Sequence, residues 1–392
     1  MSERTIRGKT AVAGLGETTY YKRAQAPDPE FKMGVEAVLL AAEDAGIDVR
    51  EIDGFASYSN DRNSPERIAS ALGIPHYGFS NMFWGGGGGG GSGAMANAVA
   101  AIAAGYSDVV VVYRALAQGQ FGRFGQGAAV PKVTGQGAFT APYGLMSPAQ
   151  TFAMRVQRFM HEHGVSQDVL RAISLTSYAH AQNNPRAVMQ GRELTEEIYE
   201  NSRWIVEPFH LFDCCMENDG AAAVIVVSAE RAKDLKQKPA YILGAAQGSF
   251  LRQGASAHNA PDYATSNFKT VAPKLYAQAG VGPKDVDVLQ SYENFTGGVL
   301  MSMVEHGFCE PDECNEFFTT ENFRAPDGKL PLNTSGGNLA ECYMHGLELI
   351  TEAVKQIRGT SPNQVEKVDV SMVTSGPMVQ PVSSMILASE PS

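Results

Sequence analysis

The strongest constraint on the fold is an internal repeat, because motifs of the first part of the chain return in the second part at one offset. Ser-Tyr at residues 57–58 returns at 291–292, and Ile-Asp at 52–53 returns as Val-Asp at 286–287. The offset is 234 residues in both cases, since 292 − 58 and 287 − 53 are equal. Repetition at a fixed spacing indicates duplicated structural units. The 392 residues are therefore expected to form two related halves.

Each half alternates short apolar runs with amphipathic segments, which is typical of α/β folds. The run Val-Val-Val-Val-Tyr at 109–113 is almost continuously apolar, as in a parallel strand buried on both faces. We expect strands near 10–14, 52–58, 109–113, 220–227 and 240–243, with helices at 33–45 and 92–104.

The repeat divides the chain into an N-terminal half at 1–235 and a C-terminal half at 236–392. The first half carries an insertion at about 115–165, of which 115–143 is rich in Gly, Gln and Phe. Long loops in compact domains are more often functional than not. We therefore expect a lid over the substrate, with Phe121 and Phe124 in contact with the substrate or with CoA.

Charge and hydropathy exclude several classes of partner. The formal net charge of −11 disfavours nucleic acid and anionic membranes. No apolar run approaches the roughly 20 residues that span a bilayer. The N-terminus has no apolar signal core, so we expect a cytoplasmic protein.

The spacing of cysteines and histidines predicts no metal site. The five cysteines include no CxxC pair. His161 and His163 lack the His-Glu-x-x-His spacing of a zinc-binding helix. Cys214 and Cys215 precede an apolar strand, and we interpret them as small buried hydrophobic residues.

Several motifs in combination resemble one protein family. Asn-Thr-Ser-Gly-Gly at 333–337, followed by Glu-Cys-Tyr-Met-His-Gly at 341–346, resembles the late signature of the thiolase superfamily. The segments at 180–185 and 207–215 resemble its sterol-carrier-protein-type branch. The resemblance covers almost the whole chain. It implies a thiolase-like, five-layered αβαβα fold whose duplicated halves have pseudo-twofold symmetry.

The reactive positions of thiolases are replaced in this chain. Gly90 stands where thiolases carry the nucleophilic Cys, Tyr343 stands at the catalytic His, and Tyr292 stands at the Asn or His of another motif. No acyl-enzyme forms without a nucleophile at the helix start, so Claisen chemistry of the thiolase kind is disfavoured. This set of departures resembles the lipid-transfer-protein-type aldolases of steroid side-chain degradation.

The resemblance to these aldolases implies a lyase that cleaves a β-hydroxyacyl-CoA by a retro-aldol reaction. The implied substrate is of the 17-hydroxy-3-oxo-pregnene-carboxyl-CoA type, and the implied products are a 17-ketosteroid and propionyl-CoA. The resemblance also implies a separate OB-fold and zinc-ribbon partner, and we expect a homodimer within an α2β2 complex. No cofactor is implied beyond the CoA of the substrate, and zinc is expected only in the partner.

Two tyrosines supply what a retro-aldol reaction needs, namely removal of the β-hydroxyl proton and stabilisation of the thioester enolate. A phenolate at pH 7 costs about 4 kcal/mol, because a phenol has a pKa near 10. A helix start after Tyr343 would offset roughly 0.3–1 kcal/mol of that cost. We therefore expect concerted proton transfer or a shared proton, with Tyr343 on the β-hydroxyl and Tyr292 on the thioester oxygen and enolate.

Neighbouring residues complete the predicted site. The glycine run at 85–91 has no Lys of a phosphate loop. It precedes a helix start, where Gly90, Gly91 and Ser92 are expected to bind substrate or an oxyanion. Glu293 is a weaker candidate base, since adjacent strand residues point to opposite faces. The residues expected beside the tyrosines are Glu293, Asn294, Asn338, Cys342 and His345.

Two other functions are compatible with the sequence. An acyl-CoA thiolase with another nucleophile would use Ser92 or Cys342 and would form an acyl-enzyme. A non-catalytic carrier of lipid or acyl-CoA, or a subunit that stabilises a partner, would bind steroid-CoA without turnover.

Overall fold

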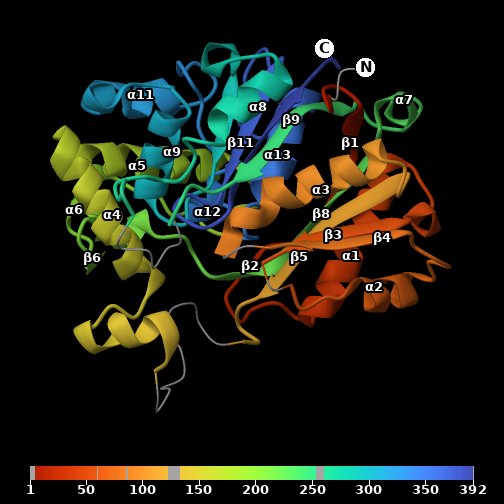
Figure 1. Cartoon of the computed structure of the whole chain (residues 1–392), viewed down its shortest axis with the longest axis horizontal. Coiled ribbons are helices and arrows are strands. Elements are labelled where there is room, and N and C mark those ends of the chain that lie inside the picture. Colours follow the sequence, from red (N-terminus) through yellow and green to blue (C-terminus); the bar gives the residue numbers. More distant parts are fainter. Residues whose placement is uncertain (1–4, 60, 85–86, 122–132, 253–259, 392) are drawn as a thin grey trace.

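The computed structural model describes residues 5–59, 61–84, 87–121, 133–252 and 260–391. A mixed β-sheet runs through both halves of the chain (Figure 1). The halves join at one seam, where residues 10–12 of β1 (Thr10–Glu17) pair antiparallel with residues 240–242 of β9 (Ala240–Gly248).

In the described part of the first half, the main path of the sheet follows the order β4-β3-β5-β8-β1. β3 is parallel to β4 and β5, whereas β8 is antiparallel to β5 and β1. β5 and β8 are buried along nearly their whole length, which explains their continuously apolar sequences. The bounds are β3 (Gly54–Tyr58), β4 (Phe79–Phe83), β5 (Val109–Ala117) and β8 (Asn218–Ser228), and the short β2 (Tyr21–Lys22) pairs with β8.

The second half repeats this order as β10-β11-β12-β9. β10 (Val288–Ser291) is parallel to β11 (Val370–Ser375), and β12 (Val382–Ala388) is antiparallel to β11 and β9. The counterpart of β4 is reduced to a parallel bridge between Leu289 and Leu332. The strand order therefore confirms the duplication predicted from the repeat.

Helices form three layers around the two groups of strands. α3 (Gly91–Ala103) and α13 (Leu347–Arg358) lie between the halves and contact strands of both. α1 (Glu30–Ala45) packs on β1, β5 and β8, and α8 (Ala272–Ala279) packs on β9 and β12. The order α, β, α, β, α confirms the predicted thiolase-like fold.

Further helices surround this core. α4 (Pro148–His163) and α5 (Gln167–Asn183) pack against α9 (Thr296–Glu305). No helix in the described part of the chain is long and apolar enough to cross a membrane. The remaining elements are α2 (Pro65–Leu72), α6 (Glu196–Glu200), α7 (Ala229–Ala232), α10 (Cys314–Phe317), α11 (Thr320–Phe323), α12 (Gly337–Ala340), β6 (Trp204–Val206) and β7 (Phe209–His210).

The composition of α3 explains how this helix fits between two layers of strands. Its first turns, Gly-Ser-Gly-Ala-Met, are completely enclosed. A Cβ added to Gly93 would lie 2.4 Å from the ring of Phe83, so no larger residue fits there without movement. Small side chains let the helix approach both groups of strands closely.

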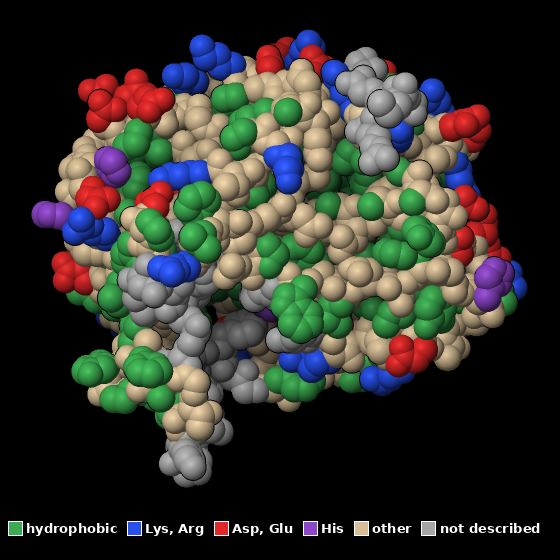
Figure 2. Space-filling model, in the orientation of Figure 1, with side chains coloured by type: hydrophobic (Ala, Val, Ile, Leu, Met, Phe, Trp, Pro, Cys, Tyr) green, Lys and Arg blue, Asp and Glu red, His purple; other side chains and the backbone are tan. Residues whose placement is uncertain are grey.

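The insertion of the first half starts later than the sequence predicted. Residues 115–117 complete β5, because their side chains continue its buried pattern, and residues 148–163 form α4. The part between them that the structure describes, 118–121 and 133–147, includes a protrusion at the lower left of Figures 1 and 2. Hydrophobic side chains gather on this protrusion; Phe139, Tyr143 and Met146 are 79%, 87% and 76% exposed. Phe124 lies outside the described residues.

Candidate active site

The structure brings Tyr292 and Tyr343 together. Tyr292 directly follows β10, and Tyr343 lies in the loop between α12 and α13. The Tyr292 hydroxyl donates a hydrogen bond of 2.6 Å to the Tyr343 hydroxyl, and the ring centroids are 5.9 Å apart. Only 1% of Tyr292 and 6% of Tyr343 is exposed. The two loops thus present a buried, hydrogen-bonded pair of phenols.

Glycines make the space that Tyr292 occupies. A Cβ added to Gly88 would lie 1.6 Å from the Tyr292 hydroxyl oxygen, and one added to Gly346 would lie 2.9 Å from the Tyr292 ring. The glycine run of the first half therefore allows its backbone to approach a phenol of the second half.

The position of the thiolase nucleophile is closed by Tyr58. A Cβ added to Gly90 would lie 2.4 Å from Tyr58 Cβ, so a reactive side chain has no room at residue 90. The Tyr58 hydroxyl lies 3.2 Å from the carbonyl oxygen of Met344 and 3.1 Å from that of His345, and donates to this loop. The sequence repeat pairs Tyr58 with Tyr292, so the repeat alone could have identified Tyr58 as a residue of the site.

Burial raises the pKa of both Tyr292 and Tyr343 well above 10. α13 begins at Leu347, after Gly346, and Tyr343 lies in the preceding loop. The help expected from this helix start stays a prediction. The resting pair therefore consists of two neutral phenols.

A segment that the sequence did not assign to the site joins the two tyrosine loops. The backbone N–H of Cys215 donates to Asn294 O at 3.0 Å. Asn218 Oδ1 accepts from the backbone N–H of Tyr343 at 2.6 Å. The half-buried Cys215 packs against the cluster that contains both tyrosines. This packing agrees with the interpretation of Cys215 as a small hydrophobic residue.

Glu293 points away from the tyrosines. Its carboxylate accepts a hydrogen bond of 2.5 Å from Ser177 Oγ on α5, and burial raises its pKa to about 7. Asn338 fixes the same loop, because its Oδ1 accepts from the Glu293 N–H at 2.7 Å and its Nδ2 donates to Glu348. Asn338 thus supports the Tyr292 loop, while Glu293 is not placed to take a proton at the tyrosines.

His345 lies beside Tyr343, with the two rings edge to face at 4.9 Å. Its Nδ1 accepts from the Arg114 guanidinium at 2.8 Å. Burial, together with the charge of Arg114, holds the pKa of His345 well below its usual value. A neutral imidazole that accepts from Arg114 serves to orient the Tyr343 loop.

The candidate nucleophiles of a thiolase are poorly placed for attack. Ser92 is completely buried, and its hydroxyl oxygen lies 2.9 Å from that of Ser375. The Ser92 N–H, expected to bind an oxyanion, already donates to Ser375 Oγ at 3.2 Å. Cys342 packs with Leu116 and Met344, and burial raises the pKa of its thiol well above the ordinary value.

The other predicted residues have the following neighbours. Asn294 Oδ1 accepts from the Phe295 N–H at 3.0 Å. Gly91 lies in the central layer, where a Cβ would meet Ile350 at 3.5 Å. The Phe121 ring is partly exposed and lies 3.6 Å from the Arg62 guanidinium.

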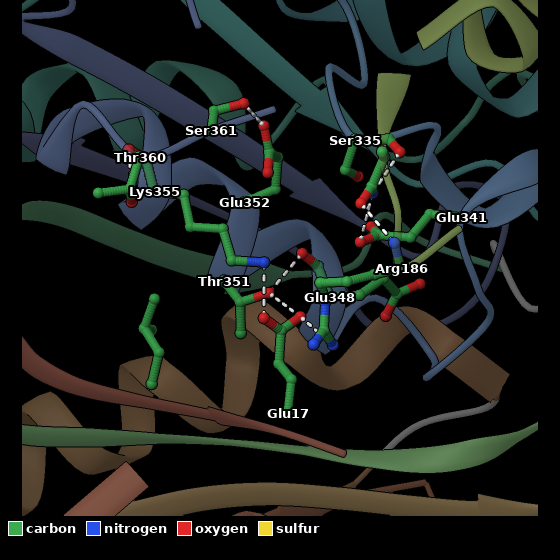
Figure 3. Close-up of polar contacts among 12 residues, drawn as sticks. Glu17, Arg186, Ser335, Glu341, Glu348, Thr351, Glu352, Lys355, Thr360 and Ser361 are labelled. Atoms are coloured by element: carbon green, nitrogen blue, oxygen red, sulfur yellow. Dashed lines mark hydrogen bonds and ion pairs between the residues drawn. The ribbon is translucent and has the colours of Figure 1, made fainter. Parts of the chain in front are cut away.

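A buried polar network ties α13 to the first half (Figure 3). Lys355 Nζ lies 2.6 Å from a carboxylate oxygen of Glu17, and Thr351 donates to Glu17 at 2.8 Å. Although burial raises the pKa of Glu17, Lys355 and Arg186 lower it to about 2. Burial raises the pKa of Glu341 to about 7. This network anchors the helix that follows the Tyr343 loop.

Within the residues that the structure describes, no three His, Cys, Asp or Glu side chains lie together so as to hold a metal ion.

Comparison with known proteins gives this geometry a context. Residues 251–389 match a family model described as thiolase C-terminal domain-like. The chain is 40% identical to the steroid side-chain-cleaving aldolase of Thermomonospora curvata, over 98% of this chain and 99% of the relative. It is 38% identical to the 17-hydroxy-3-oxo-4-pregnene-20-carboxyl-CoA lyase of Mycobacterium tuberculosis, over 97% and 100%. The chain belongs to the steroid side-chain-cleaving aldolases of the thiolase superfamily.

A solved structure of the Ltp2-ChsH2(DUF35) aldolase agrees with this aldolase over 98% of both chains, with a TM-score of 0.90 and 39% identity. The acetyl-CoA acetyltransferase of Syntrophomonas wolfei has a TM-score of 0.68 at 16% identity, covering 98% of this chain and 99% of that one, and shows the shared fold alone. The resemblance found in the sequence motifs is thus confirmed.

Proposed function

We propose that this aldolase cleaves a 17-hydroxy steroid CoA thioester of the 3-oxo-pregnene-carboxyl type into a 17-ketosteroid and propionyl-CoA. The name of the 38% identical relative specifies a substrate of this type. The observation that carries the proposal is the 2.6 Å hydrogen bond between Tyr292 and Tyr343, which stands where the motifs of thiolases place other reactive groups.

In the proposed reaction the bond between the carbinol carbon and the thioester α-carbon breaks. Its electron pair passes to the thioester as an enolate, and the carbinol oxygen becomes the ketone oxygen. At rest the Tyr292 hydroxyl donates to Tyr343, so the proposed relay begins with rotation of the Tyr292 proton toward the substrate. The β-hydroxyl proton then moves to the Tyr343 oxygen, the Tyr343 proton moves to the Tyr292 oxygen, and the Tyr292 proton moves to the α-carbon. The net result of the three transfers is that one proton leaves the β-hydroxyl and one proton reaches the α-carbon. Both phenols are neutral again at the end.

A neutral relay of this kind fits the electrostatics of the site. Burial raises the pKa of both phenols well above 10, so a free phenolate is strongly disfavoured. Proton transfer by positioned groups contributes roughly 10²–10⁴-fold to rate. In this proposal the Tyr292 hydroxyl donates to the thioester oxygen and stabilises the negative charge that develops on that oxygen.

The substrate is proposed to enter beside the glycine run, with the insertion as its cover. Gly88 borders Tyr292, and the buried glycines at 88–90 carry no side chain that would obstruct a ligand beside them. Phe121 and the exposed aromatic side chains of residues 133–147 offer apolar surface for a steroid. In this proposal the N-terminal half, 1–235, supplies the cover and the glycines, and the C-terminal half, 236–392, supplies both tyrosines.

The active assembly is proposed to be an α2β2 complex of a homodimer with an OB-fold, zinc-ribbon partner that holds its own zinc. The matched Ltp2-ChsH2(DUF35) aldolase includes a second component in its name. β4 is an edge strand of the described sheet, with Met82 46% and Trp84 90% exposed. Such an edge is available for pairing with a second copy of the chain.

The direct test is incubation of the protein, with and without its co-expressed partner, with 17-hydroxy-3-oxo-4-pregnene-20-carboxyl-CoA. Mass spectrometry should detect the 17-ketosteroid and propionyl-CoA in equal amounts. The matched thioester without the 17-hydroxyl should bind and remain intact, because it has no proton to give to Tyr343. Acyl transfer to Ser92 or Cys342 would favour the thiolase, and binding without turnover would favour the carrier.

A further inference from the structure

Asparagine side chains hold the backbone on both sides of Tyr292. Asn333 Nδ2 donates to Ser291 O at 2.8 Å, and Asn333 Oδ1 accepts from the Ser291 N–H at 2.6 Å. Asn338 Oδ1 accepts from the Glu293 N–H at 2.7 Å. Both asparagines are completely buried, and a buried backbone group that loses its partner costs about 1–3 kcal/mol. The path of the chain through Tyr292 is therefore fixed at both of its neighbours.

Asn338 also closes the loop that carries Tyr343. Its Nδ2 donates to the carboxyl of Glu348, which lies in the first turn of α13. This hydrogen bond joins the two ends of segment 338–348, of which Tyr343 is the middle residue. One amide thus contacts the backbone beside one phenol and the base of the loop that carries the other.

The backbone fixes the orientation of the Asn338 amide. The Glu293 N–H can only donate, so Asn338 Oδ1 faces Glu293 and Nδ2 faces Glu348. Burial raises the pKa of Glu348 well above 4.5, and a neutral carboxyl still accepts through its carbonyl oxygen. The Asn338 bridge, from the Glu293 N–H through the Asn338 amide to the Glu348 carboxyl, therefore requires an acceptor and a donor on one side chain at residue 338.

We propose that Asn338 is a positioning residue, which holds the two phenol hydroxyls within hydrogen-bonding distance by joining the Tyr292 and Tyr343 loops. This inference rests on the proposed roles of the tyrosines. The hydroxyl oxygens are 2.6 Å apart, at the short end of the roughly 2.6–3.2 Å over which a catalytic proton is transferred. A displacement of about 1 Å can lower the rate of a reaction roughly 10²-fold. A side chain that fixes both loops relative to one another therefore supports the proton relay.

Replacements at both ends of the Asn338 bridge test this role. Asn338→Ala removes the amide and should lower kcat roughly 10–100-fold, with KM within about threefold of the wild type. Glu348→Met removes the acceptor with little change in volume and should lower kcat to a similar extent. Glu348→Gln keeps a carbonyl acceptor and should stay within about threefold of the wild type. Asn322→Ala is the matched control and should leave kcat unchanged, because Asn322 is also a helical residue and its amide donates to Phe317 O at 2.8 Å.

A crystal structure of Asn338→Ala tests the geometry without kinetics. The hydroxyl oxygens of Tyr292 and Tyr343 should be more than about 3.2 Å apart in this variant. An unchanged distance of 2.6 Å would overturn the inference. If Asn338→Ala does not fold, the two replacements of Glu348 decide, and equal kcat values in Glu348→Met and Glu348→Gln would overturn it.

A double replacement separates positioning from a general structural role. In the Tyr343→Phe background, Asn338→Ala should lower kcat no further, because the hydroxyl that Asn338 positions is already absent. A further loss of about tenfold in that background would show a general structural effect and would contradict the positioning role.

The outcomes also distinguish this inference from the proposed function. If Tyr343→Phe impairs cleavage but Asn338→Ala retains the wild-type kcat, the positioning role is wrong and the tyrosine mechanism stands. If Tyr343→Phe retains full cleavage, the tyrosine mechanism itself is wrong, and the distance between the hydroxyls in Asn338→Ala then decides whether the Asn338 bridge holds the pair.

Discussion

Tyr58 and Tyr292 occupy equivalent positions in the two halves, and each reaches into the other half. Tyr58 ends β3 and donates to the carbonyls of Met344 and His345, whereas Tyr292 follows β10 and lies against Gly88. The duplication thus produced two tyrosines with different duties. Tyr58 fills the space beside Gly90, where thiolases carry their nucleophile, and supports the Tyr343 loop. Tyr292 forms the hydrogen-bonded pair with Tyr343.

Replacement of Tyr292 or Tyr343 by Phe removes one hydroxyl and little volume. Each change should lower kcat by roughly 10²–10⁴, because each removes a proton-transfer group. Tyr276→Phe is the control, since it also removes a largely enclosed hydroxyl, one that donates to His306 O. Release of propionyl-CoA measures the effect, and thermal unfolding checks that the variants fold. Near-normal cleavage by both variants would exclude the two-tyrosine mechanism.

Gly88→Ala should abolish activity with modest loss of stability, because its Cβ would lie 1.6 Å from the Tyr292 hydroxyl oxygen. Gly248→Ala is the matched control, since its Cβ would meet only an ordinary contact at 3.4 Å. Steady-state kinetics and unfolding curves of the two variants give the comparison. Equal activity in both would show that the Tyr292 position tolerates displacement.

Gly90→Cys should not restore thiolase chemistry. The new side chain would meet Tyr58 Cβ at 2.4 Å, and such overpacking costs about 1–3 kcal/mol. Urea unfolding should show the loss, and mass spectrometry after incubation with an acyl-CoA should show no acylated Cys. A stable, acylated variant would contradict this explanation of Gly90.

The raised pKa of the Glu293 carboxyl should make the free energy of unfolding fall as pH rises. Burial raises its pKa from 4.5 to about 7, so the folded state keeps a proton that the unfolded chain releases. The resulting stabilisation is complete below pH 4.5 and is lost as pH rises through 7. The difference in unfolding free energy between wild type and Glu293→Gln should change by roughly 3 kcal/mol between pH 4.5 and 8. Glu313→Gln, an exposed control, should leave the wild-type slope unchanged.

Replacement of Lys355 should lower the free energy of unfolding, because the buried network then lacks a cation. Lys355→Met leaves Glu17 buried without its closest cation, which costs about 3–5 kcal/mol. The double change Glu17→Gln with Lys355→Met should recover part of that loss. Arg231→Met breaks the more exposed pair with Glu51 and should cost under about 1 kcal/mol. Similar losses in Lys355→Met and Arg231→Met, measured by urea unfolding, would argue against a role for burial.

The sequence was sufficient to predict the features that follow from the internal repeat and from the positions of the motifs. The offset between Tyr58 and Tyr292 matches the equivalence of β3 and β10, because duplicated segments keep their strand order. The alternation of strand side chains placed Glu293 away from Tyr292, and it lies against Ser177 on the other side. The sequence placed the start of the insertion at about 115, whereas β5 continues to Ala117, because Ala115, Leu116 and Ala117 extend its buried pattern.

The contacts between distant segments could not be predicted in this way. Asn218 and Tyr343 are 125 residues apart, and only the folded chain shows their hydrogen bond. Cys214 and Cys215 are identical neighbours in the sequence, yet the Cys214 thiol is directed to His210 O, whereas Cys215 packs against the cluster that contains both tyrosines. No periodicity distinguishes two adjacent cysteines whose partners come from different parts of the fold.

The position of α3 between the two groups of strands has a consequence for unfolding. Because this helix contacts β3, β4 and β5 on one side and β9, β11 and β12 on the other, each half provides part of the cover that the other needs. Separation of the halves would leave an Ala-rich and Val-containing face in water. The two copies of the ancestral unit have therefore become a single cooperative body, and calorimetry should record one heat-absorption peak for the whole chain.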